Sequence, residues 1–191
     1  MSWLVDELDA AASAIDAPAI RRLHALGVTN AALVNAMDQI GPYPPVGIVR
    51  IEIDRGGLWQ PSEHGRPAIV QPVTAGGELL DLVAWRSADP LAFHLRTGHA
   101  WALGVDNLER LYWTSAAPPL RVHPTPLAWL AAGGGGLTVL DWRSADLVEL
   151  RLLERITVRS SSFARVLRDA LMRPPRMPTI TADSEGVRRA A

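Results

Sequence analysis

Apolar residues recur every three or four positions through residues 2–40, which is the spacing that one buried face of an α-helix requires. Asp16 and Thr29 can each cap the free N–H groups of a new helix, while Gly27 and Gly41 suit helix ends. The pattern predicts three short helices. Their spacing also fits a helix-turn-helix unit, but the second and third helices carry few bases, so we favour a packing role.

The pattern changes to alternating apolar and polar residues after the Gly41–Pro45 break. Short connections that contain glycine separate the apolar runs that follow, which is typical of an antiparallel meander. We expect its strands at 48–54, 58–60, 68–73 and 79–85. Asp89 and Pro90 then predict the start of a short helix over 91–95.

The second half of the chain alternates between strand and helix patterns, which predicts a C-terminal parallel β-α-β-α unit. Weaker strand patterns come first, and the final residues are small and charged. We therefore expect an α+β fold with N-terminal short helices in a helical segment (1–41), an α+β core domain (46–181) and a flexible tail (182–191). The expected elements are strands at 99–105, 111–114, 120–123, 137–140, 156–158 and 179–181, and helices at 126–130, 145–153 and 162–172.

The pentapeptide Trp-Arg-Ser-Ala-Asp occurs twice, at 85–89 and at 142–146, each time directly after an apolar run. Its Ser and Asp can cap a following helix in both places. We therefore expect Trp85 and Trp142 to be buried at the ends of neighbouring strands in the centre of the sheet. On that basis, truncation of Trp142 to Ala should cost about 3–5 kcal/mol.

Composition excludes several kinds of chemistry. The 191 residues include no Cys and no Lys, since all 19 basic residues are Arg. Thiol nucleophiles, Cys-ligated zinc, Walker-A phosphate loops and Schiff-base enzymes are thereby excluded for this chain. The net charge is −1, the N-terminus lacks the pattern of a secretory signal, and no apolar stretch is long enough to span a bilayer. We expect a cytoplasmic protein without a membrane partner.

Candidate catalytic groups are few. Asp141 follows an apolar strand and could hold a metal, whereas Asp81 lies inside an apolar strand and needs a partner such as Arg86 or Arg143. Arg143 breaks the closely spaced Asp pair of a phosphoryl-transfer site, and the five His residues form no zinc motif. The 133–136 glycine run follows a helix, which is the wrong polarity for a phosphate loop. We assign no catalytic residue, metal ligand or cofactor.

Basic residues gather between 151 and 176, where seven Arg face only Glu154 and Asp169. A strand at 156–158 would prevent a continuous basic stripe, although Arg165 and Arg168 should share one helix face. We therefore expect weak, non-specific binding of nucleic acid at most, with a dissociation constant of about 10⁻⁵ M or weaker at physiological salt. The candidate nucleic-acid-binding residues are Arg151, Arg155, Arg159, Arg165 and Arg168.

The runs DLVAWRSADPLAFHLRTGHAWALG and RVHPTPLAWLAAGGGGLTVLDW resemble uncharacterised bacterial proteins of phages and integrated mobile elements, over about residues 45–145. The resemblance brings no catalytic residue. It leads to the hypothesis of a small non-enzymatic protein of a mobile element that binds another macromolecule. The alternatives are a nucleic-acid accessory protein acting through 151–176, and a metal-dependent hydrolase or phosphotransferase with a site near Asp141.

Overall fold

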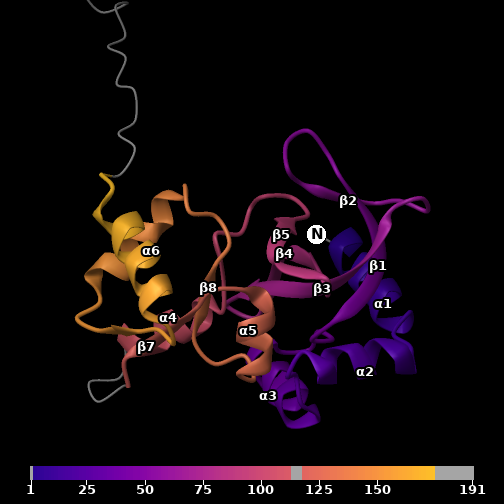
Figure 1. Ribbon diagram of the computed structural model, residues 1–191, viewed down its shortest axis with the longest axis horizontal. Coiled ribbons are helices and arrows are strands. Elements are labelled where there is room, and N and C mark those ends of the chain that lie inside the picture. Colours follow the sequence, from indigo (N-terminus) through magenta and orange to yellow (C-terminus); the bar gives the residue numbers. More distant parts are fainter. Residues whose placement is uncertain (1, 113–117, 175–191) are drawn as a thin grey trace, which may run out of the picture.

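The computed structural model describes residues 2–112 and 118–174, which form N-terminal helices, an antiparallel sheet and a smaller mixed sheet with helices. This confirms the predicted α+β class. Figure 1 shows the N-terminal helices and the first sheet on one side, the last strands and helices on the other, and helix α5 between them. The strand expected at 179–181 and the tail at 182–191 lie outside the described residues.

The three predicted N-terminal helices are present as α1 (Ser2–Ser13), α2 (Ala17–Ala25) and α3 (Asn30–Ile40). The Asp16 carboxylate accepts a hydrogen bond from the Ala19 N–H at 2.8 Å, and the Thr29 hydroxyl accepts one from the Ala32 N–H at 3.1 Å. Both residues therefore cap the helices as their sequence positions predict. Gly41 ends α3 with a φ of +79°, a backbone conformation that favours glycine.

The first sheet is an antiparallel meander in which β3 occupies the centre, with the order β2-β1-β3-β4-β5. The predicted helix at 91–95 is wrong, because these residues belong to edge strand β5. Phe93 and Leu95 pair with Trp85 and Val83 of β4, and Pro90 is tolerated at an edge. The strands are β1 Gly47–Ile53, β2 Trp59–Pro61, β3 Arg66–Ala75, β4 Glu78–Arg86 and β5 Asp89–Leu95.

The second sheet has the order β6-β8-β7-β9, and β7 runs parallel to both of its neighbours. Leu111 lies in a helix rather than in the predicted strand, and the segment after β8 is a 3-10 helix, η1. The elements are β6 Ala102–Leu103, α4 Val105–Tyr112, β7 Leu120–His123, α5 Pro126–Ala131, β8 Leu137–Val139, η1 Ala145–Leu152, β9 Ile156–Thr157 and α6 Ser161–Met172.

The two copies of Trp-Arg-Ser-Ala-Asp have different structures. Asp89 pairs with Arg86 in a tight hairpin, so the first copy caps no helix, whereas the Ser144 hydroxyl caps η1 by accepting from the Asp146 N–H at 3.2 Å. Trp85 is fully buried, but Trp142 lies beyond the end of β8 in the other sheet and is half-buried. The prediction of two buried Trp residues on neighbouring strands is therefore wrong for Trp142.

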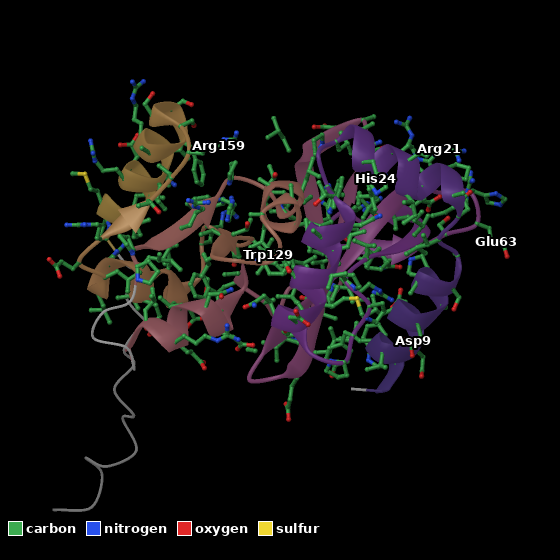
Figure 2. All side chains as sticks on the ribbon, turned by 90° about the horizontal axis from the view of Figure 1, so that it is seen from below. Asp9, Arg21, His24, Glu63, Trp129 and Arg159 are labelled. Carbon is green, nitrogen blue, oxygen red and sulfur yellow. The ribbon has the colours of Figure 1, made fainter. Side chains whose placement is uncertain are left out.

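Both faces of the first sheet are covered. Alternate residues of β3 and β4 point to opposite faces. Ala68, Val70 and Leu82 pack with Leu4 and Leu8 of α1. The intervening residues pack instead against α2, α3 and α5, where Trp129 lies in the middle of the molecule (Figure 2). The N-terminal helices therefore share their cores with the sheet. A separate apolar cluster joins the second sheet to α4, η1 and α6.

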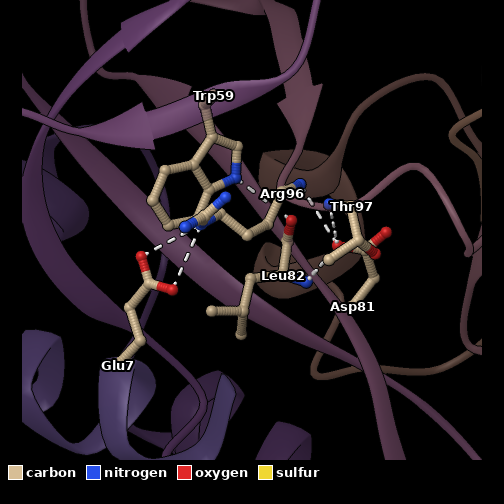
Figure 3. Close-up of polar contacts among 6 residues, drawn as sticks. All are labelled: Glu7, Trp59, Asp81, Leu82, Arg96 and Thr97. Carbon is tan, nitrogen blue, oxygen red and sulfur yellow. Dashed lines mark hydrogen bonds and ion pairs between the residues drawn. The ribbon is translucent and has the colours of Figure 1, made fainter. Parts of the chain in front are cut away.

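Asp81 lies fully buried in β4, and its carboxylate is satisfied by backbone N–H groups rather than by the predicted Arg86 or Arg143 (Figure 3). Five backbone N–H groups donate to it, which offsets the cost of burying the charge. Oδ1 accepts from Leu82, Arg96 and Thr97 at 2.8, 3.1 and 2.9 Å, and Oδ2 accepts from His99 and Ala100 at 2.9 and 3.4 Å. Asp81 therefore holds the 96–100 segment against the sheet.

The Arg96 side chain links this segment to α1. Its Nε donates to both carboxylate oxygens of Glu7 at 3.1 Å, and its guanidinium lies 5.4 Å from the Trp59 ring centroid (Figure 3). The Trp3 ring centroid lies 4.9 Å from the same guanidinium. Trp59 Nε1 in turn donates to the Leu82 carbonyl at 3.2 Å. Aromatic faces attract a cation, so this cluster fixes the sheet to the first helix.

Candidate functional site

A groove of about 750 Å³ opens where the parallel strands β7 and β9 end. Leu120 pairs with Ile156 and Arg121 with Thr157, so the carboxyl ends of both strands meet at one edge of the sheet. Open α/β sheets bind their ligands at such an edge. We call this the β7–β9 groove. Its lining includes Leu26, Arg121, His123, Thr125, Leu127, Ala131, Thr157, Arg159, Ser160 and Phe163.

Two arginines give the groove a positive charge. Arg121 and His123 are two residues apart on β7 and therefore share a face, while Arg159 follows the end of β9. Neither Arg121 nor Arg159 forms an ion pair with any residue that the structure describes, and no Asp or Glu occurs among the described lining residues. Both side chains are exposed, and Figure 2 shows Arg159 beside α6. The groove is thus suited to an anion.

His123 is the one buried titratable group among the described lining residues of the groove. Its Nε2 donates to the Gly135 carbonyl at 2.9 Å, so the neutral ring keeps its lone pair on Nδ1. Burial lowers the pKa of His123 below its usual value; nearby Arg121 lowers it further, while the Gly135 hydrogen bond opposes the shift. The ring is therefore neutral at pH 7 and offers an acceptor beside Arg121.

The 133–136 glycine run contacts His123 and presents carbonyl groups to side chains. Asn107 Nδ2 donates to the carbonyls of Gly134 and Gly136 at 3.0 Å each, and Trp129 Nε1 donates to Gly136 at 3.0 Å. Three of these glycines have positive φ, which other residues rarely adopt. The run holds the groove in shape through its carbonyl oxygens, in agreement with the helix-end polarity inferred from sequence.

The hydroxyl groups of the groove already have structural partners. Thr125 accepts from the Ala128 N–H at 3.1 Å and Ser160 from the Phe163 N–H at 3.2 Å, so both cap helices that begin at the groove. Thr157 donates to the Leu120 carbonyl at 3.4 Å. Nucleophilic catalysis needs a hydroxyl hydrogen-bonded to a base, and no such pair occurs among the described lining residues. The hydroxyl groups of Thr125, Thr157 and Ser160 therefore have structural roles in the described lining.

The structure separates the arginines predicted as a nucleic-acid site. Arg159 lines the groove, whereas Arg155, Arg165 and Arg168 are exposed, the last two on α6. Arg151 is half-buried and donates to the Arg173 carbonyl, which gives it a structural role. Sequence reasoning missed Arg121, because only the parallel pairing of β7 with β9 brings it to the groove that Arg159 lines.

Asp141 does not line the groove. Its Oδ1 accepts from the Arg143 N–H at 2.8 Å, which closes a turn after β8. Within residues 2–112 and 118–174, no three His, Cys, Asp or Glu side chains gather closely enough to hold a metal ion. The same part of the chain contains no helix of sufficient length and apolar character to cross a membrane.

Comparison with known proteins gave no match to any family model, curated protein or solved structure.

Proposed function

We propose that this is a non-enzymatic binding protein that holds a phosphate-bearing ligand in the β7–β9 groove. The observation that carries the proposal is that Arg121, which pairs with the last residue of β9, and Arg159, which follows that strand, line one groove and have no carboxylate partner among the described residues. The planar guanidinium group matches the geometry of phosphate oxygens and can bind two of them at once. The start of the twelve-residue helix α6 adds a favourable dipole at the same edge.

The surroundings of the groove support binding over reaction. Thr125, Thr157 and Ser160 are engaged in capping or strand contacts, and the His123 ring is held by the glycine run. A neutral His123 can accept a hydrogen bond from a hydroxyl of the ligand or from a singly protonated phosphate. Apolar side chains such as Leu127 and Phe163 line the same groove and can contact a base or another ring.

The phosphate could belong to a free nucleotide or to a nucleic-acid backbone. Arg165 and Arg168 are exposed on α6, which begins at the groove, so a longer basic surface favours the second source. Exposed Glu154 and Asp169 weaken that surface. A nucleic-acid accessory role is therefore the second candidate. Whichever source supplies the phosphate, we propose that the protein is cytoplasmic. We also propose that it binds another macromolecule encoded with a phage or mobile element.

The test uses two probes, ADP in isothermal titration and fluorescein-labelled single- and double-stranded DNA in fluorescence anisotropy at two salt concentrations. Arg121→Gln and Arg159→Gln should each weaken binding about 10- to 100-fold, since a hydrogen bond to a charged group contributes about 1.5–3 kcal/mol. Arg165→Gln is the matched control, because Arg165 is exposed on α6 and does not line the groove.

The two sources give different patterns. ADP binding that falls in the groove variants but not in Arg165→Gln indicates a nucleotide site. DNA binding that falls in all three variants, with a steep dependence on salt, indicates nucleic acid. Wild-type affinity in Arg121→Gln and Arg159→Gln, or no binding of either probe, refutes the groove proposal.

The non-enzymatic part has a separate test. Wild-type protein should not hydrolyse nucleotides or DNA in the presence of Mg²⁺ or Mn²⁺, and Asp141→Asn should leave ligand binding unchanged because Asp141 only closes a turn. Metal-dependent hydrolysis by the wild type that is lost in Asp141→Asn would instead establish the metal-dependent hydrolase alternative.

A further inference from the structure

A second cavity, of about 380 Å³, lies between α2 and the first sheet, beside the first residues of β1, the first residues of β3 and the end of β4. We call it the α2 cavity. It shares no lining residue with the β7–β9 groove. The small side chain of Ala19 on α2 leaves space here, and Leu23, Val46 and Ile69 form apolar walls. Its volume lies in the range of small-molecule sites.

Three arginines from three separate elements line this apolar cavity: Arg22 of α2, Arg66 at the start of β3 and Arg86 at the end of β4. None of them forms an ion pair with a residue that the structure describes, and the described lining contains no Asp or Glu. Arg66 and Arg86 also line an adjoining space of about 220 Å³ beside Trp85. Positive charge therefore surrounds a cavity that has apolar walls.

We infer that the α2 cavity binds a small apolar acid, with its carboxylate on the arginines and its aliphatic or aromatic body against the apolar walls. An arginine binds a carboxylate through two parallel hydrogen bonds, and these strengthen in surroundings of low dielectric. A cation is repelled by the three guanidinium groups. A neutral alcohol of the same length gains the apolar contacts but loses the charge-assisted bonds, so it binds more weakly.

The test measures binding of octanoate by isothermal titration, with octanol and octyltrimethylammonium as probes of the same chain length. Octanoate should bind at least about tenfold more tightly than octanol, which corresponds to one charge-assisted hydrogen bond. Hexanoate should bind more weakly than octanoate by about fourfold for each methylene removed, because the methylene groups are buried in the cavity. Octyltrimethylammonium should not bind.

Variants locate the site. Arg22→Gln and Arg86→Gln should each weaken octanoate binding at least about tenfold. Arg21→Gln is the matched control, because Arg21 is the neighbouring residue of the same helix, is exposed and does not line the cavity (Figure 2). Ala19→Leu should fill the cavity and abolish binding. Thermal melting shows whether each variant is folded, and the polar substitutions at exposed Arg22 and half-buried Arg86 keep the test valid if Ala19→Leu does not fold.

The outcome is independent of the phosphate groove, since Arg121→Gln should leave octanoate binding unchanged while it weakens phosphate binding. The inference is overturned if folded wild-type protein shows no saturable octanoate binding below about 10 mM. Equal affinity for octanol, or equal loss of affinity in Arg21→Gln and Arg22→Gln, overturns it as well, because either result removes the role of the cavity arginines.

Discussion

Replacement of Asp81 by Asn changes a single oxygen of a fully buried carboxylate to an NH₂ group, so its cost can be worked out from the hydrogen bonds. The less damaging orientation keeps an oxygen at the Oδ1 position and retains the bonds from Leu82, Arg96 and Thr97. It places an amide nitrogen at Oδ2, where the N–H groups of His99 and Ala100 donate at 2.9 and 3.4 Å. Donors then face donors.

Two charge-assisted bonds are lost, each worth about 1.5–3 kcal/mol, so Asp81→Asn should lower the free energy of unfolding by about 3–6 kcal/mol. This is a large part of the roughly 5–15 kcal/mol that stabilises an ordinary domain. The loss should be measured by urea unfolding followed by circular dichroism and tryptophan fluorescence. The 96–100 segment should also lose protection from proteolysis, because Asp81 holds its backbone.

Asp141→Asn is the matched control for this prediction. Asp141 is half-buried and accepts one backbone hydrogen bond, from Arg143, so its replacement should cost no more than about 1 kcal/mol. If Asp81→Asn unfolds within about 1 kcal/mol of the wild type, or if the two variants lose similar stability, the role assigned to the buried carboxylate is wrong.

Three further predictions concern packing, pH and backbone strain. Trp85→Ala should cost about 3–5 kcal/mol, and half-buried Trp142→Ala only about 1–2 kcal/mol, in urea unfolding. Because the pKa of His123 is lowered in the folded protein, the unfolded chain takes up a proton first as the pH falls, so wild-type stability should decrease below the usual His pKa of 6.5. The stability of His123→Asn should decrease less steeply in thermal melts between pH 7.5 and 5. Parallel curves for the two proteins would contradict this. Gly104→Ala should lower the free energy of unfolding by at least about 2 kcal/mol, because φ is +83° and a Cβ would lie 2.3 Å from a backbone carbonyl oxygen. Gly57→Ala, where φ is +84° and the space is open, should lower it by about 1 kcal/mol. Equal losses of stability would exclude the steric explanation.

Local rules predicted the parts of the fold in which local chemistry decides the structure. The caps at Asp16 and Thr29 and the alternating strands of the meander follow from neighbouring residues alone. The rules failed at 91–95, where Asp89 and Pro90 resemble a helix start. There the tertiary pairing of Phe93 and Leu95 with β4 overrides the local preference. The repeated pentapeptide shows the same effect, since it turns in a hairpin at one place and caps η1 at the other.

The candidate groove could be predicted only in part. The basic character of 151–176 was visible, and it included Arg159, but three of the remaining candidates are simply exposed and Arg151 has a structural contact. Arg121 and His123 are isolated in the sequence. They join Arg159 only because β7 lies beside β9, which is a long-range pairing that no local pattern specifies.

The strand order of the second sheet has a consequence for how the chain assembles. Val122 of β7 pairs with Leu137 of β8 across a short connection through α5, whereas Leu120 pairs with Ile156 of β9 only after η1 has also been traversed. Closing the longer loop costs more entropy, so we expect β7 and β8 to dock first and β9, with α6, to dock last. Pulsed hydrogen exchange during refolding should then protect the amides that link β7 to β8 before those that link β7 to β9. The groove would therefore be completed only in the step that adds β9 and α6.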